Sequence, residues 1–507
     1  MTHDLFTDKD LKRIRDEGLS KREVMSQLKI FKRAFAPIKL KRPCTVGDGI
    51  IVIPDTDRKS LITNYNEASQ QRKIIKFVPA SGAASRMFRD WFRYAEMKDF
   101  NTGQSGADFM ENLTQFAFYD DLQKSISENG DNITSLITNR QLQNILEYVL
   151  TLKGLNYANL PKALIKFHSY PNRNRTPLEE HLVEAALYVQ DASHICRIHF
   201  TVSNEHKADV ENYLSKVMKY YEGKYGVKYD LSLSVQLSST NTIAVDMSNN
   251  PFRDNEGKLV FRPGGHGALL KNLNSIDGDI IFLKNIDNVV PDRLKPATVL
   301  HKKILGGYLV QLQEEIFANL RLLVEEQADN ETLYRIARFC NEQLFIDLPR
   351  SFEILSTSQK IDIMIDKLNR PIRVCGMVKN EGEPGGGPFW IEENQTLSLQ
   401  IIEQAQVDLE SYEQKRIWNS STHFNPVDLV CGVKDYRGQK FDLEKFVDKN
   451  AYIISQKSWK GRSLKALELP GLWNGAMARW NTVFVEVPTV TFNPVKTVND
   501  LLRKEHM

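Results

Sequence analysis

The sequence has few cysteines, no long apolar stretch and no excess of charge of either sign. The chain of 507 residues contains only five cysteines, which are scattered and include no Cys-x-x-Cys pair. A disulfide framework and a zinc site are therefore not expected, and a reducing compartment fits this cysteine usage. No apolar run reaches the roughly 18–20 residues of a membrane-spanning helix, and the first residues lack a signal-peptide core. We expect a cytoplasmic protein without a membrane partner.

The positive and negative charges nearly cancel along the whole chain. There are 67 Lys and Arg against 64 Asp and Glu, a formal net charge of +3 at pH 7. This balance indicates neither a nucleic-acid partner nor an acidic tail. Apolar residues make up 41% and charged residues 26%, which excludes disordered, collagen-like and coiled-coil chains. The length allows two or three domains, and a chain of this kind is most often an enzyme.

Short apolar, β-rich runs alternate with helical patterns from residue 71 onward. Several runs are almost continuously apolar, as in strands buried on both faces of a mostly parallel sheet. The alternation itself predicts an α/β fold. The predicted strands cover residues 74–80, 163–170, 196–203, 231–237, 279–290, 372–379, 451–456 and 481–488.

The sequence divides into an arm, an α/β core and a C-terminal segment. Residues 1–70 are charged and show helical spacing, which predicts an N-terminal helical arm. The core of residues 71–430 is interrupted by two helical insertions, at about 90–155 and 298–370. Residues 431–507 form a C-terminal segment with two further strands and a short helix.

A loop of small residues follows the first predicted core strand, with an amphipathic helix after it. Small side chains let backbone N–H groups approach a phosphate, and a helix N-terminus adds partial positive charge. A tight turn without a ligand is the alternative, since a loop with one glycine is weak evidence. The guanidinium of Arg86 stands where it could reach phosphate oxygens. The candidate phosphate-binding residues are Ser81, Gly82, Ala83, Ser85 and Arg86.

A second glycine cluster, Pro-Gly-Gly-His-Gly, occupies residues 263–267. Three glycines around a histidine make a backbone that a ligand can approach closely. A glycine-rich hairpin is the alternative. The candidate binding residues are Gly264, Gly265, His266 and Gly267.

The next predicted strand ends in Asn285-Ile-Asp287-Asn288. In open α/β sheets, ligands bind beyond the carboxyl ends of the strands. A carboxylate at that edge suits Mg²⁺, which takes few carboxylates and relies on phosphate oxygens and water. An Asx-rich turn is the alternative. Because the glycine cluster comes directly before it, we favour a magnesium site with Asp287 as the ligand.

Two lysines are candidate phosphate contacts. Lys162 enters the end of a predicted strand, although a lone lysine lies more often on the surface. Lys496 comes just before Thr497, which can cap a short helix with Asp500 answering three residues later. The cap would place Lys496 beside the N–H groups of that helix, and a solvated lysine is the alternative. His181 is expected to be structural.

Taken together, these stretches resemble the sugar-1-phosphate nucleotidyltransferases, in particular the UTP–glucose-1-phosphate uridylyltransferases and UDP-sugar pyrophosphorylases. Residues 263–267 are similar to the nucleotide and sugar-phosphate loop of that family, and residues 285–288 to its metal-binding strand end. Pro-Val-Lys-Thr at 494–497 resembles a family stretch whose lysine contacts the phosphates. Leu-Pro-Lys162 looks like the family's lysine motif. The resemblance covers about residues 74–505.

One loop departs from the family pattern. The family loop usually reads Gly-Gly-x-Gly-Thr-Arg, whereas residues 81–86 read Ser-Gly-Ala-Ala-Ser-Arg. The linker sequences also resemble those of an uncharacterised family found in Bacteroides-like bacteria. No activity can be inferred from that family.

The resemblance implies a fold, an activity and a role for each candidate residue. The fold is a mixed, mostly parallel α/β sheet of the GT-A type with helices on both faces. The partners are a nucleoside triphosphate and a sugar-1-phosphate, joined with release of pyrophosphate and with Mg²⁺ as cofactor. The implied roles are catalysis by Arg86, Lys162 and Lys496, nucleotide binding by residues 81–85 and 264–267, metal binding by Asp287, and sugar binding by Asn288, Glu403 and Asn425.

Two other activities stay open on the same fold. A glycosyltransferase would use a nucleotide sugar as donor, but such enzymes usually carry Asp-x-Asp where this chain has Asn285-x-Asp287, and Lys496 would have no clear role. A non-catalytic protein that binds nucleotides or sugar phosphates is the other alternative.

Overall fold

The computed structural model describes residues 5–33, 37–82, 84–97, 110–325, 327–382, 385–393 and 395–507. The chain forms two compact units, each assembled from three separate stretches of sequence. The first unit comprises residues 1–59, 236–279 and 308–487. The second comprises residues 60–235, 280–307 and 488–507.

Four parallel strands form the centre of the second unit, in the order β9-β4-β5-β6. β4 and β9 are buried almost throughout, as their apolar runs predict. Because all four strands are parallel, their carboxyl ends lie at one edge of the sheet, where ligands bind in open α/β folds. The strands are β4 (Ile74–Pro79), β5 (Ile195–Val202), β6 (Lys228–Val235) and β9 (Ile280–Lys284).

Two of these buried strands each carry a lysine. The Lys76 and Lys284 side chains are at most 1% exposed, and both contact Glu184, a buried residue of α9 (Pro177–Tyr188). The Lys76 Nζ–Glu184 Oε2 distance is 2.7 Å and the Lys284 Nζ–Glu184 Oε1 distance is 2.8 Å. Burial alone would raise the pKa of Glu184, but the two lysines hold it well below its usual range. The Glu184 carboxylate is therefore charged and forms an ion pair with each of the two lysines.

Long helices accompany the strands of the second unit. They are α3 (Asp55–Gln71), α9, α10 (Lys207–Tyr225) and the beginning of α12 (Lys295–Val324), which continues into the first unit. α3 and α12 approach closely at Gly307, where a Cβ atom would lie 1.9 Å from the Leu61 carbonyl oxygen. Of the described helices, none is long and apolar enough to cross a lipid bilayer.

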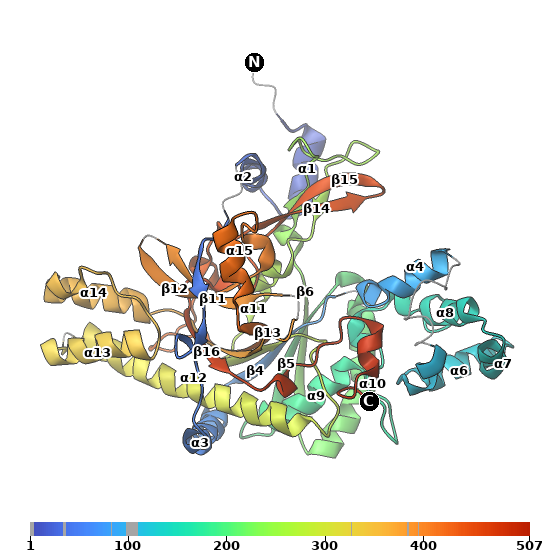
Figure 1. Cartoon of the computed structure of the whole chain (residues 1–507), viewed down its shortest axis with the longest axis horizontal. Helices are drawn as coiled ribbons and strands as arrows, with labels where there is room; N and C mark the ends of the chain where they lie inside the picture. The colour runs from blue at the N-terminus through green and yellow to red at the C-terminus, as the bar shows by residue number, and fades with distance from the viewer. Residues whose placement is uncertain are drawn as a thin grey trace. The chain divides into compact units, whose positions relative to one another are not determined.

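A group of shorter helices lies together in the second unit (Figure 1). Their apolar side chains form a cluster of their own. These helices fulfil the prediction of helical structure within residues 90–155. They are α4 (Arg89–Met97), α6 (Tyr119–Glu128), α7 (Ile133–Thr138) and α8 (Leu142–Leu150). The same cluster includes three residues from the end of the chain, Val495, Val498 and Leu501. Packing therefore attaches the last residues of the chain to this helical group.

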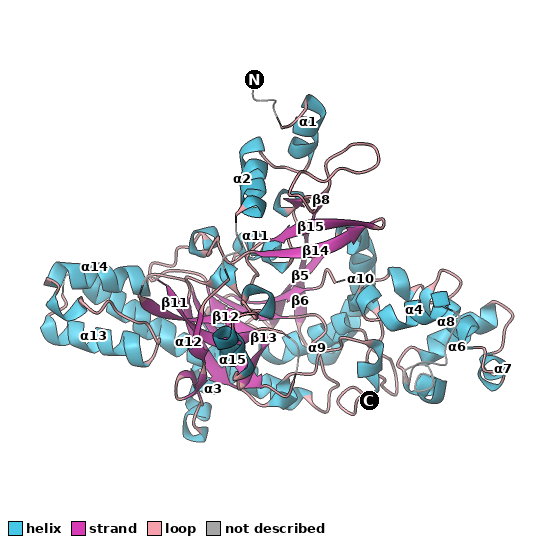
Figure 2. Ribbon diagram, turned by 45° about the horizontal axis from the view of Figure 1, so that its top comes forward, coloured by secondary structure: helices cyan, strands magenta, loops and turns pink. Residues whose placement is uncertain are grey.

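Five strands of the first unit follow one another in the order β2-β3-β16-β10-β13. All strands are magenta in Figure 2. All neighbours are parallel except β10 and β13, which are antiparallel. The strands are β2 (Thr45–Val46), β3 (Gly49–Ile51), β10 (Ile372–Lys379), β13 (His423–Gly432) and β16 (Asn481–Glu486).

Three smaller β-structures complete the first unit. A three-stranded sheet has the order β1-β11-β12, and the pairs β14-β15 and β7-β8 are antiparallel. Their bounds are β1 (Leu40–Pro43), β11 (Gly387–Glu393), β12 (Thr396–Ile402), β7 (Thr242–Ile243), β8 (Phe261–Arg262), β14 (Ile453–Trp459) and β15 (Arg462–Glu468).

The helices of the first unit include two at the start of the chain that pack on the β14-β15 ribbon. Phe6, Val24 and Leu467 belong to one apolar cluster there. Ser20 caps the second helix through the predicted capping box with Glu23. The helices are α1 (Asp8–Asp16), α2 (Lys21–Lys32), α11 (Leu270–Ser275), α13 (Asn330–Glu342), α14 (Thr357–Leu368) and α15 (Tyr412–Asn419).

The predicted mixed, mostly parallel α/β architecture is confirmed, whereas one predicted strand is wrong. Residues 163–170 form a 3₁₀ turn, Lys162–Leu164, and then irregular backbone with a single bridge from His168 to Arg175. The apolar side chains that suggested a strand, Ile165 and Phe167, pack into the helical cluster instead of against neighbouring strands. The predicted strand over 279–290 is shorter than expected and ends at Lys284.

Candidate functional site

Two lysines meet one aspartate just beyond the end of β9. The Asp287 Oδ2 atom lies 2.9 Å from Lys162 Nζ and 3.3 Å from Lys496 Nζ. The three residues come from distant parts of the sequence, and all belong to the second unit. The Asp287 and Lys162 side chains are 9% and 13% exposed, whereas Lys496 is 53% exposed. Asp287 and Lys162 thus form a largely buried pair with a solvent-facing second cation.

The electrostatics of this triad favour an anionic ligand. Burial alone would raise the pKa of Asp287, but Lys162 and Lys496 lower it below its ordinary value. Asp287 is therefore ionised at neutral pH. Two lysines against one aspartate leave a net positive charge, which suits a phosphate group.

Hydrogen bonds to backbone groups hold the three residues together. The Val495 N–H donates to the Asp287 carbonyl oxygen at 3.1 Å, and Lys162 Nζ donates to the Val495 carbonyl oxygen at 2.8 Å. The Asp500 carboxylate accepts hydrogen bonds from the N–H of Lys496 at 2.7 Å and from the following N–H at 2.6 Å. This confirms the predicted Asp500 contact at the start of a 3₁₀ helix, Val498–Leu502. The backbone on both sides of Lys496 is thereby fixed.

The small-residue loop lies directly beside Lys162. The Lys162 N–H donates to the Gly82 carbonyl oxygen at 3.2 Å, and the Ala84 N–H donates to the Leu160 carbonyl oxygen at 3.2 Å. Gly82 and Arg86 are exposed and Ser81 is half-buried. The sequence prediction also named Ala83 and Ser85, and Ala83 and the side chain of Ser85 lie outside the described residues. The loop and the triad therefore form one continuous candidate site.

Two further side chains support the segment that carries Asp287. His181, which is fully buried, donates from Nε2 to the Ile286 carbonyl oxygen at 3.2 Å, and burial keeps the pKa of His181 well below its usual range. Asn288 is 1% exposed and accepts the Asn493 N–H at Oδ1, 3.0 Å away. Its Nδ2 has no partner among the described residues. The site thus has a neutral histidine that orients its backbone and an amide donor free for a ligand oxygen.

Asp287 is the predicted magnesium ligand; its Oδ2 atom contacts two lysines, and binding of the ion stays a prediction. Asp287 supplies one carboxylate, and the described part of the chain contains no group of three His, Cys, Asp or Glu side chains able to hold a metal. Mg²⁺ commonly binds through one or two carboxylates and completes its shell with phosphate oxygens and water. Asp287 would hold the ion in that way, with phosphate oxygens as further ligands.

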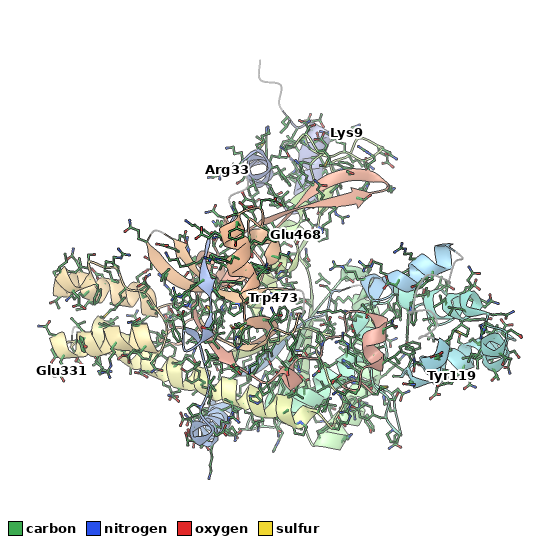
Figure 3. All side chains as sticks on the ribbon, viewed as in Figure 1. Lys9, Arg33, Tyr119, Glu331, Glu468 and Trp473 are labelled. Carbon is green, nitrogen blue, oxygen red and sulfur yellow. The ribbon has the colours of Figure 1, made fainter. Side chains whose placement is uncertain are left out.

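A second group of predicted residues meets in the first unit around His266. Glu403 Oε1 accepts hydrogen bonds from His266 Nε2 at 3.2 Å and from Asn474 Nδ2 at 2.9 Å. The Leu472 N–H donates to His266 Nδ1 at 3.1 Å, so the imidazole carries its proton on Nε2. His266 also stacks on Trp473, labelled in Figure 3, with ring centroids 4.2 Å apart and planes 25° apart.

The glycines around His266 are needed by the protein's own packing. Gly265 has φ = +73°, which other residues rarely adopt. A Cβ atom at Gly264 would lie 2.4 Å from the Thr240 carbonyl oxygen, and one at Gly267 would lie 2.2 Å from the Pro470 carbonyl oxygen. The groups that approach these glycines closely are thus backbone atoms of the first unit itself. Contact of the glycines with a nucleotide stays a prediction.

Asn425, predicted to contact sugar, supports irregular backbone in β13. It is 3% exposed, and its Oδ1 accepts the Val427 N–H at 3.1 Å. Val427 has φ = +57° and lies where the β10-β13 register shifts. This contact explains why an asparagine stands here, and its role in sugar binding stays a prediction.

The structure thus gathers the candidate residues into two sets, one in each unit. The second unit holds the loop, Lys162, Asp287 and Lys496, and the first unit holds His266 with Glu403. Sequence reasoning missed Trp473 and Asn474, which complete the His266 cluster. The run Pro-Gly-Leu-Trp-Asn-Gly at 470–475 could have indicated them. Like residues 263–267, it places glycines around a side chain with an aromatic ring.

Comparisons with solved structures find UDP-sugar pyrophosphorylases at low sequence identity. The UDP-glucose pyrophosphorylase of Leishmania major is 13% identical with a TM-score of 0.46, over 97% of this chain and 77% of that one. The UDP-N-acetylglucosamine pyrophosphorylase of Trypanosoma brucei, solved with an inhibitor, is 12% identical with a TM-score of 0.46, over 95% and 74%.

No curated protein matches the sequence. A family model described as "Domain of unknown function (DUF4301)" matches residues 7–507. The match spans nearly the whole chain, and the protein therefore belongs to the DUF4301 family.

Proposed function

We propose that this protein is a sugar-1-phosphate nucleotidyltransferase, which joins a nucleoside triphosphate and a sugar-1-phosphate into a nucleoside-diphosphate sugar and releases pyrophosphate. The observation that carries the proposal is the contact of Lys162 and Lys496 with Asp287 at the carboxyl end of β9. A carboxylate that suits Mg²⁺ and two cations that suit phosphates are what this reaction requires. The sequence resemblance assigns the same three positions to those roles.

In the proposed reaction, a phosphate oxygen of the sugar-1-phosphate attacks the α-phosphorus of the triphosphate. The bond from the α-phosphorus to the bridging oxygen breaks, and pyrophosphate leaves. The attacking phosphate is already anionic near pH 7, so no general base is needed. Catalysis then depends on positioning and on charge neutralisation. Lys162 and Lys496 would supply both by turning from Asp287 toward phosphate oxygens.

The other residues would hold the two substrates. When bound at Asp287, Mg²⁺ supplies positive charge that bridges phosphate oxygens. Arg86 and the N–H groups of the small-residue loop would hold the leaving pyrophosphate. The sequence resemblance assigns the 264–267 segment to the nucleotide, and Glu403, Asn288 and Asn425 to sugar hydroxyls.

The first test is pyrophosphate release from a panel of nucleoside triphosphates and sugar-1-phosphates with Mg²⁺, beginning with UTP and glucose-1-phosphate. Release that requires one sugar-1-phosphate and disappears in Asp287→Ala supports the proposal. Lys166→Gln is a matched control, because Lys166 is near Lys162 in sequence but pairs with Asp121 at 2.6 Å. The control should retain activity.

The two alternatives give different results in the same panel. A binding protein would show a rise in melting temperature with nucleotide but no pyrophosphate release, since a ligand of the native state stabilises it by mass action. A glycosyltransferase would release a nucleoside diphosphate from a nucleotide sugar. Neither result would be compatible with the proposed reaction.

A further inference from the structure

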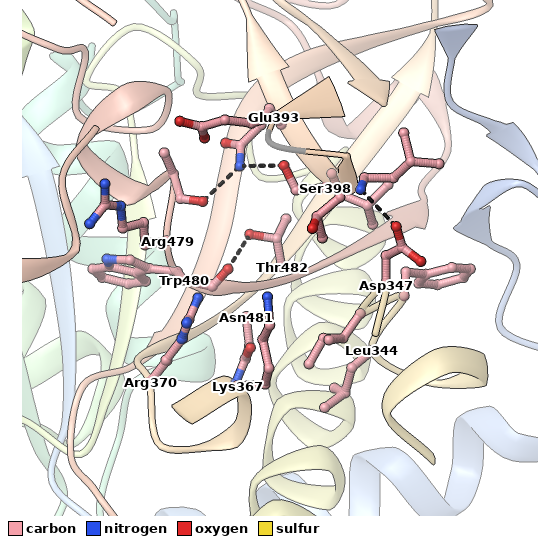
Figure 4. Close-up of a pocket in the computed structure, with 17 residues that line it drawn as sticks. Leu344, Asp347, Lys367, Arg370, Glu393, Ser398, Arg479, Trp480, Asn481 and Thr482 are labelled. Atoms are coloured by element: carbon pink, nitrogen blue, oxygen red, sulfur yellow. Dashed lines mark hydrogen bonds between the residues drawn. The ribbon is translucent and has the colours of Figure 1, made fainter. Parts of the chain in front are cut away.

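A separate cavity of about 350 Å³ lies in the first unit and includes none of the candidate residues discussed above. Its walls come from the C-terminal end of α14, the segment after α13, strand β12 and the beginning of β16 (Figure 4). Cavities that bind small molecules in proteins typically measure roughly 300–1,000 Å³. The volume therefore suits a small metabolite.

Three cationic side chains line this cavity: Lys367, Arg370 and Arg479. Lys367 and Arg370 extend in the same direction from the end of α14, as Figure 4 shows. Arg370 pairs at 2.6 Å with Asp366, whose side chain is 71% exposed. Lys367 has no hydrogen-bond or ion-pair partner among the described residues. Burial and the neighbouring Arg370 lower the pKa of Lys367, and Asp366 and Asp347 partly oppose this shift.

Two carboxylates line the cavity beside these cations, and a third, Asp366, pairs with Arg370. Asp347 and Glu393 are the acidic residues of the lining. Asp347 accepts the Leu397 N–H at 2.8 Å, and Glu393 is exposed. Hydroxyl and amide groups, from Ser398 and Asn481 among others, share the remaining wall with apolar side chains such as Leu344. The cavity thus combines three cations, of which Lys367 has no ion-pair partner among the described residues, with groups that can hydrogen-bond to hydroxyls.

We propose that this cavity binds a small phosphorylated polyol, such as a sugar phosphate. Lys367, Arg370 and Arg479 would hold the phosphate by charge-assisted hydrogen bonds, and Ser398 and Asn481 would contact hydroxyl groups. The polar lining favours a polyol over an apolar ligand. This inference does not depend on the reaction proposed above.

One buried side chain lies between this cavity and the His266 cluster. Arg373 of β10 is fully buried, donates from Nε to Thr482 Oγ1 at 2.9 Å, and donates from Nη1 to the Trp473 carbonyl oxygen at 2.5 Å. Thr482 lines the cavity, and Trp473 stacks on His266. A substitution at Thr482 or Arg373 would disturb both places. The test variants therefore leave these two residues unchanged.

The test is isothermal titration calorimetry of the full chain with glucose 6-phosphate, with glucose and orthophosphate as comparison probes. The cavity variant combines Lys367→Gln and Arg370→Gln, and we expect it to bind glucose 6-phosphate at least tenfold more weakly. Lys360→Gln is the matched control, because Lys360 is on the same helix but does not line the cavity. A Lys162→Gln variant separates this cavity from the candidate active site.

The proposal is supported if binding of glucose 6-phosphate is weakened only by the cavity variant and glucose does not bind. It is overturned if neither phosphate probe binds, or if the cavity variant binds as well as the control. Loss of binding in Lys162→Gln with retention in the cavity variant also overturns it, because the ligand then occupies the other site. Orthophosphate binding as tightly as glucose 6-phosphate would exclude the polyol part of the proposal.

Discussion

Removing either lysine at Asp287 should impair activity, but only one removal should strongly affect stability. In Lys162→Met, the buried Asp287 carboxylate keeps only Lys496, whose contact is longer, 3.3 Å instead of 2.9 Å, and whose side chain is 53% exposed. Removing one partner of a buried ion pair costs about 3–5 kcal/mol. We expect about 3 kcal/mol, because one cation remains. Lys496→Met should cost about 1 kcal/mol or less, as exposed pairs do.

The pH dependence of this difference has a definite sign. Asp287 has a lowered pKa in the native state, so its ion pairs contribute stability above the unfolded-state value of 3.8, and this contribution is lost as the pH falls through the native-state pKa. Without Lys162 the pKa of Asp287 is lowered less. The stability difference between wild type and Lys162→Met should therefore be largest near neutral pH and shrink in acid.

The assay is urea unfolding at pH 7, followed by circular dichroism and by tryptophan fluorescence to separate the transitions of the two units. Lys166→Met is the control for loss of a lysine, since its pair with Asp121 is partly exposed and should cost about 1 kcal/mol or less. Equal destabilisation by Lys162→Met and Lys496→Met would refute the reasoning, because burial would then not decide the cost.

Three further substitutions test other parts of the structure. Burial lowers the pKa of His506 from 6.5 to about 3. On acidification the unfolded chain therefore binds a proton at this histidine before the native chain does. The free energy of unfolding should fall by about 1.4 kcal/mol per pH unit below 6.5. His506→Gln should make the decline of melting temperature with acidification shallower. Gly267→Ala should cost about 1–3 kcal/mol in thermal unfolding, because its Cβ would lie 2.2 Å from a carbonyl oxygen, whereas Gly223→Ala, with open space around it, should cost nothing. Asp10 accepts two hydrogen bonds of 2.8 Å from Arg253, which lowers the pKa of Asp10 to about 2. Asp10→Asn should lower stability in urea by about 1 kcal/mol at pH 7, and the difference should vanish as the pH falls from 3.8 toward 2.

Continuous apolar runs predicted most of the central strands correctly. β4, β9 and β10 are buried on both faces. Such strands are recognisable in the sequence as continuous apolar runs, whichever strands lie beside them. The same signal failed at residues 163–170, because Ile165 and Phe167 pack against helices from the preceding insertion. Apolar periodicity shows that a side chain is buried, but it does not show which element covers it.

The residues of the candidate site could be picked from the sequence, but their contacts could not. Lys162 and Lys496 are 125 and 209 positions away from Asp287 along the chain, and only the folded sheet edge brings them together. Trp473 and Asn474 were missed for the same reason: an ordinary tryptophan and asparagine acquire their place from the distant His266 and Glu403.

The buried contact of Lys76 and Lys284 with Glu184 also limits the incorrect packings that the chain can adopt while it folds. If α9 docked one residue out of register, Glu184 would turn by about 100° around the helix axis and leave both lysines buried without a counter-charge. Each uncompensated ion costs several kcal/mol, whereas an apolar patch of the same volume would tolerate such a slip more easily. The three charges therefore lower the free energy of the correct register of α9 on the strands relative to near-native competing packings.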